Sequence, residues 1–502
     1  MLTLNEAKRL HREYDAIPLT VTLPSDLETP LSCYLKWACS YPTNFLFESV
    51  EGGESIARYS FIGADSQEEW AFKPKEIVHS TQVGVSKIHQ LPKELIEQSL
   101  DIGRVWKPDG LPGFLGGLVG YFGYETASWS EKLPRFDNPL GWPDAWLGRF
   151  KKLIIFDHRL QLLTLVSLIV HARMKNGKRH AGFDAAYEQA SGELASMAKS
   201  LIRPLPASAR AISSPSVQAT TKSSGKSSIV EDCDKASFTK MVTKAKRHIR
   251  DGDIFQVVLS RGWSIRSGRS PVDVYRSLRR QNPSPYLFLL TMNSRSIVGS
   301  SPEMLLRSTN GLLETRPIAG TRPRGKTIVQ DAALESALQA DPKELAEHTM
   351  LVDLGRNDLG RVARPGSIRV PDRLIVEKYA RVMHLVSSVT GTLRTGKTSI
   401  DALQAVFPAG TVSGAPKIRA MELIAELEQK GRGVYAGSIG YLDYHGNLDT
   451  CIGIRMASYE NGRYYVRAGA GIVADSVASR EFDETSHKAA SMIRAITEDD
   501  LC

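Results

Sequence analysis

At 502 residues the chain is too long for one ordinary hydrophobic core, and its length suggests two or more domains or subdomains. Its apolar share of 42% and charged share of 24% are typical of a globular protein and argue against a disordered or fibrous chain. The formal net charge of +9 arises from Lys and Arg spread along the sequence, not from one basic block, so we expect no nucleic-acid partner.

Two further observations concern where in the cell the protein is located. No stretch approaches the roughly 18 uninterrupted apolar residues of a membrane span, and the N-terminal residues lack the apolar core of a secretory signal. The cysteines are odd in number and form no C-x-x-C pair; they are Cys33, Cys39, Cys233, Cys451 and Cys502. We interpret them as unpaired thiols and expect a cytoplasmic protein without a membrane partner.

The composition divides the chain into three units. Residues 1–202 mix short strand-like runs, such as residues 152–157, with a glycine-rich segment at 113–123. From 203 to 234, Pro, Ser, Ala and Thr replace apolar periodicity, which is typical of an exposed linker. Residues 235–502 form a second ordered part that opens with a helix-like run at 238–251.

In this second part, predicted strands and helices follow one another. Strands are predicted at 254–260, 434–442, 448–456 and 463–467, and Asn461-Gly462 predicts a two-residue hairpin turn between the last two. Helices are predicted at 342–354, 399–407, 415–428 and 479–496. The mixture indicates an α+β fold, and the hairpin favours largely antiparallel sheets.

The phosphate-loop pattern G-x-x-x-x-G-K-[ST] occurs twice, at 320–327 and 391–398. Each copy would normally suggest backbone N–H groups that cradle a nucleotide's phosphates. In the first copy Pro323 removes one of the necessary N–H donors, and we expect no apolar strand to lead into the second. Both features argue against a nucleotide-hydrolysing enzyme.

Two predicted helices begin with carboxylates three residues apart, Glu344 with Glu347 and Glu481 with Glu484. Residues at this spacing share one helix face, so four carboxylates on facing helices could hold a divalent cation together with water, as Mg²⁺ prefers. Each pair also has an ordinary structural explanation. Glutamates suit the first turn of a helix, and Glu484 with Lys488 fits an i,i+4 ion pair.

Several long segments follow the order found in one enzyme family. They are residues 314–325, 346–362, 407–417, 469–476 and 481–488, together with 47–53 and 116–121 in the first part. In these segments the chain resembles the chorismate-utilising enzymes, and within them the large subunits of anthranilate synthases. The resemblance implies large antiparallel sheets packed as a sandwich with helices outside. It also implies that residues 1–202 form a tryptophan-binding regulatory domain and residues 235–502 a chorismate-binding catalytic domain.

The resemblance further implies a Mg²⁺ site, in which Glu347 and Glu484 lie closest to the ion while Glu344 and Glu481 act mainly through its waters. Such a cation would neutralise charge on chorismate, which carries two carboxylates. The residues implied to bind chorismate itself are Tyr435, Arg455, Gly469, Ala470, Gly471 and Lys488. The glycines would let backbone N–H groups approach the pyruvyl carboxylate closely.

The reaction implied is the conversion of chorismate and ammonia into anthranilate and pyruvate, the first step of tryptophan biosynthesis. Glu303 would be the general acid that protonates the departing C4 hydroxyl as ammonia enters at C2. His384 would assist the later loss of the C2 proton and of pyruvate, although a lone His is more often a hydrogen-bonded core residue. Thr411 also stands at a matching catalytic position, and its structural alternative is a loop hydroxyl.

Two positions distinguish the chain from sister enzymes of the family. Relatives that add water carry Lys at the position of Gln256, and many aminodeoxychorismate synthases carry Lys at the position of Ala319. The chain has neither lysine, which favours ammonia addition without a covalent lysine intermediate. Two alternatives stay open: an aminodeoxychorismate synthase that stops at the 4-amino product, and a non-catalytic relative that senses tryptophan or acts as a scaffold.

Family members obtain ammonia from glutamine. No cysteine of this chain lies in a glycine-flanked nucleophile elbow, so we expect a separate glutamine amidotransferase subunit as partner. The resemblance also implies feedback inhibition by L-tryptophan, bound by Ser49, Pro285, Tyr286 and Leu287. Leu287 stands where the family usually has Met, a substitution that conserves volume.

Overall fold

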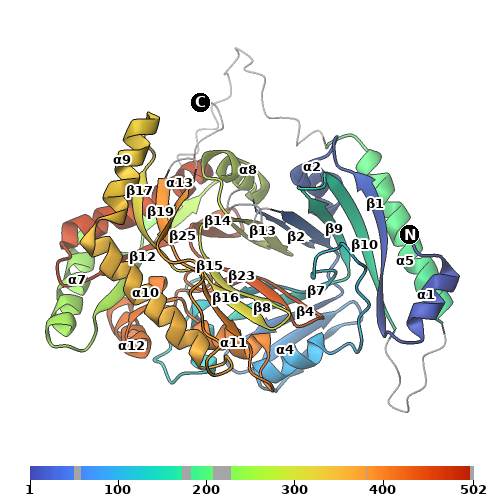
Figure 1. Cartoon of the computed structure of the whole chain (residues 1–502), viewed down its shortest axis with the longest axis horizontal. Coiled ribbons are helices and arrows are strands. Elements are labelled where there is room, and N and C mark those ends of the chain that lie inside the picture. The colour runs from blue at the N-terminus through green and yellow to red at the C-terminus, as the bar shows by residue number, and fades with distance from the viewer. Residues whose placement is uncertain (50–57, 172–181, 207–227, 380–381, 498–502) are drawn as a thin grey trace.

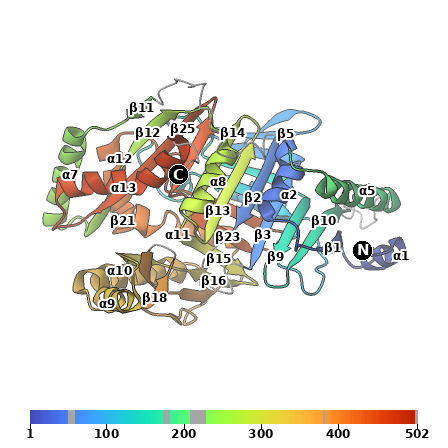
Figure 2. The ribbon, with the colours of Figure 1, turned by 90° about the horizontal axis from the view of Figure 1, so that it is seen from above.

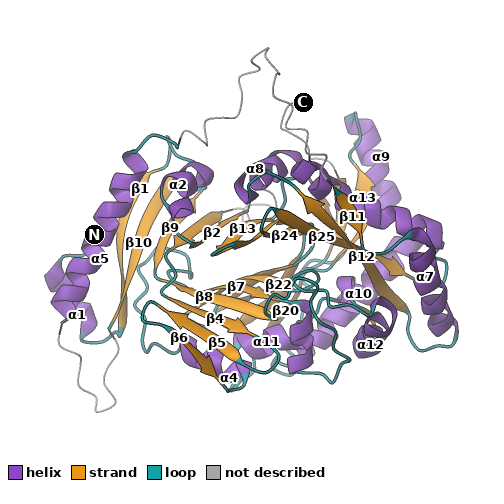
Figure 3. Cartoon of the chain, turned by 180° about the vertical axis from the view of Figure 1, so that it is seen from behind, coloured by secondary structure: helices purple, strands orange, loops and turns teal. Residues whose placement is uncertain are grey.

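The computed structural model describes residues 1–49, 58–171, 182–206, 228–379 and 382–497. Two large sheets face each other, and helices cover their outer faces (Figures 1 and 3). The strand pairs within these sheets are antiparallel. The α+β sandwich with helices outside is therefore confirmed.

Within the described residues the larger sheet has twelve strands, which draw on both ends of the sequence. In sheet order they are β1 (Ala16–Pro24), β10 (Leu162–Val170), β9 (Lys152–Asp157), β3 (Tyr59–Ala64), β2 (Thr43–Glu48), β13 (Tyr286–Met292), β14 (Arg295–Ser301), β24 (Met456–Glu460), β25 (Arg463–Ile472), β12 (Gln256–Arg266) and β11 (Ile229–Glu231), with β21 (Gly414–Ala415) also paired to β12.

The smaller sheet and a third, minor sheet lie against it. The smaller sheet runs β20 (Val389–Thr392), β16 (Leu312–Thr315), β15 (Met304–Thr309), β23 (Leu448–Ile452), β22 (Ser438–Asp443), β7 (Gly117–Phe122), β8 (Ala145–Phe150), β4 (Glu68–Phe72), β5 (Ile77–Thr81) and β6 (Val85–Ile88). The minor sheet runs β17 (Ile318–Pro323), β19 (Val382–Val386) and β18 (Ile375–Lys378).

The helices of the described residues are α1 (Leu4–His11), α2 (Pro30–Lys36), α4 (Pro92–Leu100), α5 (Phe183–Ile202), α7 (Lys235–Arg250), α8 (Pro271–Gln281), α9 (Ile328–Gln339), α10 (Pro342–Gly360), α11 (Ser399–Val406), α12 (Lys417–Glu428) and α13 (Ala478–Thr497). Three short 3₁₀ turns join them, η1 (Ala38–Ser40), η2 (Tyr124–Trp129) and η3 (Gly410–Val412). Figure 2 shows α1 and α5 at one end of the molecule and α7, α12 and α13 at the other. Among these described helices, none has both the length and the apolar character of a membrane span.

Alternation along the strands creates two apolar layers. On β13, Leu287 and Leu289 pack toward the outer helices, whereas Phe288 and Leu290 pack between the two large sheets. Phe45 of β2 also belongs to the inner layer, where its ring meets that of Phe150 edge-on at 4.9 Å. Because successive side chains of a strand point to opposite faces, a sheet buried on both faces is apolar at every position.

Both large sheets combine strands from the two parts of the sequence. In the larger sheet β2 pairs with β13, with Phe47 opposite Phe288, and in the smaller sheet β7 pairs with β22, with Gly120 opposite Gly440. Of the predicted linker at 203–234, residues 207–227 lie outside the described residues, and residues 229–231 form β11. The division into a regulatory and a catalytic unit stays a prediction, and the two parts share one set of sheets.

One predicted strand consists of two. The prediction of a continuous strand at 448–456 is wrong, because β23 ends at Ile452 in the smaller sheet and β24 begins at Met456 in the larger one. At this crossing Arg455 has a positive φ of 52°, and a Cβ at Gly453 would lie 2.4 Å from the carbonyl oxygen of Val434. Buried residues lie on both sides of the crossing, so the sequence pattern shows no break there.

Other predicted elements agree more closely. The hairpin is confirmed, because β24 and β25 are joined through Asn461 and Gly462, whose φ angles of 52° and 75° suit a type I′ turn. The strand predicted at 434–442 begins only at Ser438, after Ala436 with a φ of 63°. The four predicted helices of the second part are found as α10, α11, α12 and α13, with shifted ends.

The two phosphate-loop patterns belong to helix caps. The hydroxyls of Thr327 and Thr398 accept hydrogen bonds from the N–H groups of Gln330 and Asp401 at the starts of α9 and α11. β20 runs into the first two residues of the second pattern, but its sequence Val-Thr-Gly-Thr has a single apolar side chain and so is not the apolar strand of a phosphate loop. This strand has only four residues, too few to be recognised from apolar periodicity.

A buried ion pair fixes the end of α12. The side chains of Glu428 and Arg432 are each 1% exposed, and Arg432 Nη2 lies 2.6 Å from Glu428 Oε1. Arg432 also donates to the carbonyl oxygens of Val258 at 2.8 Å and Val412 at 2.7 Å. Although burial opposes ionisation, Arg432 and Arg467 hold the pKa of Glu428 below its ordinary value.

We predict that Glu428→Gln lowers the free energy of unfolding by about 3–5 kcal/mol, because Arg432 would keep a buried charge without its partner. Glu422 on the same helix provides a matched control, since its 2.8 Å pair with Arg419 is partly exposed. Glu422→Gln should change the free energy by only about 0–1 kcal/mol. Denaturant unfolding measures both variants, and equally small effects would contradict the role given to the buried pair.

Candidate active site and a second cavity

The main cavity encloses about 560 Å³ where β12 and β25 meet α10, α13 and the minor sheet. The predicted catalytic, substrate-binding and metal-binding residues that line it are Glu303, Glu344, Glu347, His384, Thr411, Tyr435, Arg455, Gly469, Gly471, Glu481, Glu484 and Lys488. Ala470 is the exception, because it is fully buried between the two lining glycines of β25. Its side chain points to the opposite face of the sheet.

Gly469 and Gly471 allow two side chains to approach the backbone of β25. A Cβ at Gly469 would lie 2.7 Å from the hydroxyl oxygen of Tyr435, and one at Gly471 would lie 2.7 Å from Nε2 of the Gln256 side chain. Any larger residue at either position would displace a side chain of the cavity wall.

Glu303 lies in the connection between β14 and β15 and is 8% exposed. The hydroxyl of Thr411, in η3, donates a hydrogen bond to Glu303 Oε1 at 3.0 Å. Burial raises the pKa of Glu303 to about 8, against the opposing effect of this hydrogen bond. The carboxyl group is therefore mostly protonated at neutral pH, which is the state that a general acid requires.

His384 lies on β19 with its Nδ1 atom 3.0 Å from the carbonyl oxygen of Gly320. The Thr321 hydroxyl lies at the same distance from Nδ1 and can donate or accept. Because the carbonyl oxygen of Gly320 only accepts, it favours the tautomer that carries the proton on Nδ1 and the lone pair on Nε2. Burial lowers the pKa of the His384 ring, which favours the neutral imidazole. The arrangement provides a proton acceptor and not a cation.

Four carboxylates reach the cavity from the first two turns of two helices. Glu344 and Glu347 belong to α10, which Asp341 caps, and Glu481 and Glu484 belong to α13. Burial raises the pKa of Glu347 and of Glu481, and in each case a neighbouring glutamate adds to the shift. A positive charge bound between the helices would relieve both effects.

This donor set fits a magnesium ion held partly through water. Within the described residues, no three acidic, histidine or cysteine side chains converge closely enough to form a complete metal cage. Magnesium commonly takes one or two carboxylates and keeps several waters, so a dispersed set of acids suffices. Glu484 is already paired with Lys488 at 2.6 Å and Glu344 with Arg322 at 3.4 Å, so Glu347 and Glu481 are the two of the four that lack an ion pair within the described residues.

Arg455 and Lys488 supply positive charge beside these acids. Arg455 lies at the crossing between β23 and β24, and its Nη1 donates to the backbone carbonyl of Lys488 at 3.2 Å. Lys488 Nζ donates to the carbonyl of Gly469 at 3.1 Å. Burial lowers the pKa of Arg455, but a guanidinium stays charged at any physiological pH.

Arg467 also lines the cavity but was not assigned to the site from the sequence. Its Nε donates to the hydroxyl of Ser260 at 2.8 Å, and its Nη2 lies 3.3 Å from Glu428 Oε2. Alternate residues of a strand point to the same face, and Arg467 precedes Gly469 by two residues on β25. This spacing could have identified Arg467 as a residue of the site.

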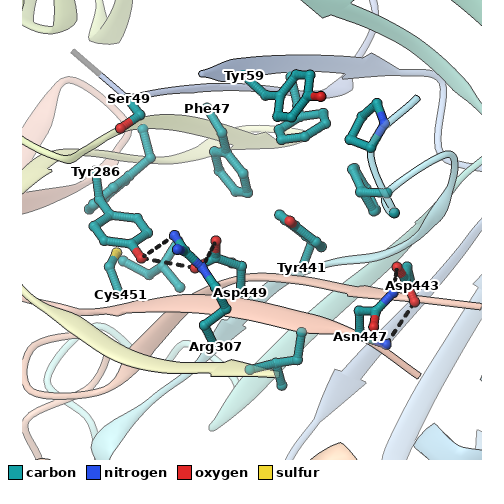
Figure 4. A pocket seen from close by; sticks show the side chains of 18 of the residues that line it. Phe47, Ser49, Tyr59, Tyr286, Arg307, Tyr441, Asp443, Asn447, Asp449 and Cys451 are labelled. Carbon is teal, nitrogen blue, oxygen red and sulfur yellow. Dashed lines mark hydrogen bonds and ion pairs between the residues drawn. The ribbon is translucent and has the colours of Figure 1, made fainter. Parts of the chain in front are cut away.

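A second cavity of about 350 Å³ lies between the two large sheets (Figure 4). The four predicted tryptophan-binding residues line it, namely Ser49, Pro285, Tyr286 and Leu287. The Ser49 hydroxyl is buried and finds no hydrogen-bond partner among the described residues. Leu287 packs its side chain with the apolar layer on the other face of β13, so its backbone borders the cavity.

A polar cluster at one wall of this cavity was not predicted. The hydroxyl of Tyr286 donates to Asp449 Oδ1 at 2.9 Å, and Arg307 Nε lies 3.0 Å from Asp449 Oδ2 (Figure 4). Arg307 and Asp449 are directly opposite each other on β15 and β23. The sequence did contain a hint of this cluster, since Arg307 and Asp449 are each a charged residue within a short strand that is otherwise largely apolar.

Comparison with known proteins gives extensive matches. A family model described as chorismate binding enzyme matches residues 43–494. Anthranilate synthase component 1 of Acetivibrio thermocellus is 42% identical over 99% of this chain and 98% of that protein, and the component 1 of Aquifex aeolicus is 41% identical over 99% and 97%. The crystal structure of anthranilate synthase component I from Streptococcus pneumoniae has a TM-score of 0.75 at 35% identity, covering 94% of this chain and 99% of that one.

A more distant structure shares the fold. The menaquinone-specific isochorismate synthase of Escherichia coli has a TM-score of 0.68 at 20% identity and covers 98% of each chain. The family match extends from β2 to α13 and so includes most of both large sheets and the walls of both cavities. The chain therefore belongs to the chorismate binding enzyme family, and the two relatives named above, matched over nearly their whole length, are components 1 of anthranilate synthases.

Proposed function

We propose that this chain is the large subunit of an anthranilate synthase, which converts chorismate and ammonia into anthranilate and pyruvate in the first step of tryptophan biosynthesis. One observation carries the proposal: a single cavity is lined by the buried carboxyl group of Glu303, the imidazole of His384, four cationic side chains and four further carboxylates. Relatives of that name, matched over nearly their whole length, support it.

The substrate's two carboxylates account for the charged walls. Arg455 and Lys488 would bind the pyruvyl carboxylate beside the backbone of Gly469. Burial raises the pKa of Tyr435, which keeps its hydroxyl protonated and able to donate to the same group.

The four glutamates of α10 and α13 would hold Mg²⁺, and as before we expect Glu347 and Glu484 to lie closest to it and Glu344 and Glu481 to act mainly through its waters. When bound, the cation would neutralise the ring carboxylate and stabilise electron density that develops next to it. Without positive charge, the same acids would repel a dianionic substrate.

In the first stage, the ammonia nitrogen forms a bond to C2 while the bond from C4 to its hydroxyl oxygen breaks. Glu303 gives its proton to that oxygen, which leaves as water. Thr411 keeps the Glu303 carboxyl in place through their 3.0 Å hydrogen bond. The nitrogen now bonded to C2 loses one proton to become an amine, and the Glu303 carboxylate regains one proton before the next cycle, so the stage consumes chorismate and ammonia and releases water.

In the second stage, C2 loses its proton, the bond to the enolpyruvyl oxygen breaks, and the ring becomes aromatic. The departing enolpyruvate takes up a proton and becomes pyruvate. The Nε2 atom of His384 would accept this proton through its lone pair, because Nδ1 is bonded to the carbonyl of Gly320.

Two lysines that sister enzymes carry are replaced in this chain, and their replacement bears on the reaction. Gln256 and Ala319 line the main cavity at positions where sister enzymes carry a nucleophile-activating or nucleophilic lysine. Neither side chain activates water or forms a covalent adduct, which supports direct ammonia addition. We further propose that a glutamine amidotransferase subunit supplies the ammonia, and that L-tryptophan binds in the second cavity as an inhibitor.

The first test mixes the purified chain with chorismate, ammonium salt and Mg²⁺ at mildly alkaline pH. We expect anthranilate fluorescence to rise, and EDTA to stop the rise by removing the cation that the glutamates hold. Consumption of chorismate with formation of another product would assign the chain to a sister reaction. No consumption at all would favour a non-catalytic role.

The pKa of Glu303 predicts the alkaline limb of the activity profile. Because burial raises this pKa to about 8, the active protonated form dominates below that pH and is lost above it. With the concentration of free ammonia held constant, turnover should fall about tenfold per unit well above pH 8. Glu303→Gln should lower turnover by about 100-fold or more while chorismate binding is kept. A flat profile would contradict the assignment of Glu303 as the acid.

If tryptophan binds in the second cavity, a substitution in the cavity wall should weaken its inhibition. Ser49→Ala removes a buried hydroxyl that lacks a partner among the described residues, and so removes one hydrogen bond to a bound ligand. The tryptophan concentration for half-inhibition should rise about 3- to 10-fold, with uninhibited activity unchanged. Inhibition curves measure the shift, and an unchanged midpoint would place tryptophan elsewhere.

A further inference from the structure

The first two turns of α13 carry Glu481 and Glu484, two of the acids that we propose to hold Mg²⁺. The later turns are fixed by side chains that pack in the apolar layer outside the larger sheet, namely Ala489, Met492, Ala495 and Ile496. Before these residues, the buried position of α13 is Thr485, which is polar, and Phe482 is only half-buried. Apolar packing therefore gives the carboxylate-bearing turns little support.

Arg261 of β12 supplies that support. Its side chain is 1% exposed, and its guanidinium carbon lies 3.8 Å from the centre of the Phe482 ring. Its Nε donates to the hydroxyl of Thr485 at 2.7 Å, and its Nη2 donates to the hydroxyl of Ser486. The ring of Trp263 lies 4.4 Å from the same guanidinium carbon. One rigid, planar group thus contacts three residues at the start of α13.

The charge of Arg261 is balanced by a residue outside α13. Its Nη1 lies 2.6 Å from Glu231 Oε2 on β11, and the side chain of Glu231 is 47% exposed. The contacts with α13 are a ring contact and hydrogen bonds to hydroxyls, which depend on direction. The two ends of the guanidinium therefore serve different purposes, because one orients α13 and the other neutralises the buried charge.

The orientation of α13 determines where its carboxylates point. Successive residues of a helix are about 100° apart around its axis, so Phe482 and Thr485 share a face next to that of Glu481 and Glu484. Holding the first face against Arg261 fixes the rotation of the helix about its axis. Because Mg²⁺ demands near-ideal octahedral geometry, a changed rotation should weaken its binding.

Arg261 reaches α13 from the side of β12 that faces away from the main cavity. Gln256 and Val258 line that cavity, whereas Val257 and Leu259 pack with side chains of α7 and α12. Because successive side chains of a strand alternate between its faces, Arg261 shares the face of Val257 and Leu259. Its influence on the cavity therefore passes through α13.

From these observations we infer that Arg261 is a positioning residue of the proposed Mg²⁺ site, which it serves by fixing the rotation of α13. The inference rests on the proposed function, since it assumes that Glu481 and Glu484 help to hold the cation. Residues that orient metal ligands commonly contribute about 10- to 100-fold to metal affinity, so the effect should be measurable.

The test changes the two ends of the Arg261 contact separately. Thr485→Val keeps the shape of the side chain but removes the hydroxyl that accepts from Arg261, and Arg261→Lys keeps the charge but loses the planar fork. Glu231→Gln is the matched control, because it removes the ion pair and leaves the contacts with α13 in place. Calorimetry measures Mg²⁺ affinity with chorismate present and ammonium absent, and denaturant unfolding measures the stability of each variant.

Thr485→Val and Arg261→Lys should each weaken Mg²⁺ binding about tenfold, whereas Glu231→Gln should leave it within about twofold of the unaltered chain. All three variants disturb a buried guanidinium and should lose stability. With ammonium added, anthranilate formation by Arg261→Lys should recover at saturating Mg²⁺. Unchanged affinity in both Thr485→Val and Arg261→Lys would overturn the inference. So would an affinity that falls in step with stability in all three variants, because Arg261 would then have only a structural role.

Failure of the proposed function would look different. If the unaltered chain bound no Mg²⁺, or if Glu484→Gln bound it as tightly as the unaltered chain, the metal assignment would be wrong and the inference on Arg261 would fall with it. If Glu484→Gln lost Mg²⁺ binding while Thr485→Val and Arg261→Lys kept it, the metal assignment would stand and only the positioning role of Arg261 would be wrong.

Discussion

The guanidinium of Arg432 is the interaction on which the main cavity depends. It pairs with Glu428 and donates to the carbonyl oxygens of Val258 and Val412, and it lies 5.7 Å from the centre of the Tyr435 ring. These contacts join α12 to strand β12, to turn η3 and to the loop before β22. Three separate walls of the cavity are thereby held to one rigid planar group. Replacing that group by a flexible cation would keep the charge but lose the geometry.

The two cavities are connected by shared strands. The segment that carries Glu303 in the main cavity continues directly into β15, which carries Arg307 in the second cavity. Likewise β23 carries Asp449 and then leads through the crossing to Arg455. A ligand that moves the paired side chains of Arg307 and Asp449 would therefore act on the same two segments that hold Glu303 and Arg455, the proposed acid and the proposed substrate-binding group. Regulation and catalysis need no separate moving domain for this to occur.

Much of the fold and of the candidate site could be predicted from the sequence, and the exceptions have physical causes. The paired carboxylates of α10 and α13 were identified because helix starts and a three-residue spacing are local signals. The crossing before Arg455 was missed because buried residues continue on both sides of it. Arg307 and Asp449 were missed because their contact depends on a register between strands separated by more than a hundred residues. The packing of Leu287 away from the second cavity follows from which face of β13 is inward, and only the assembled sheet determines that.

The sharing of both sheets by the two parts of the sequence has a consequence for synthesis. During translation, β2 lacks one of its two neighbours until β13 emerges, and β7 lacks one of its two until β22 emerges still later. At roughly 5–20 residues per second, the first of these delays is on the order of tens of seconds. Throughout that time the nascent chain carries open, largely apolar strand edges, which are templates for mispairing with other chains. The single set of sheets that builds both cavities thus makes the growing polypeptide dependent on protection until nearly its whole length has been made.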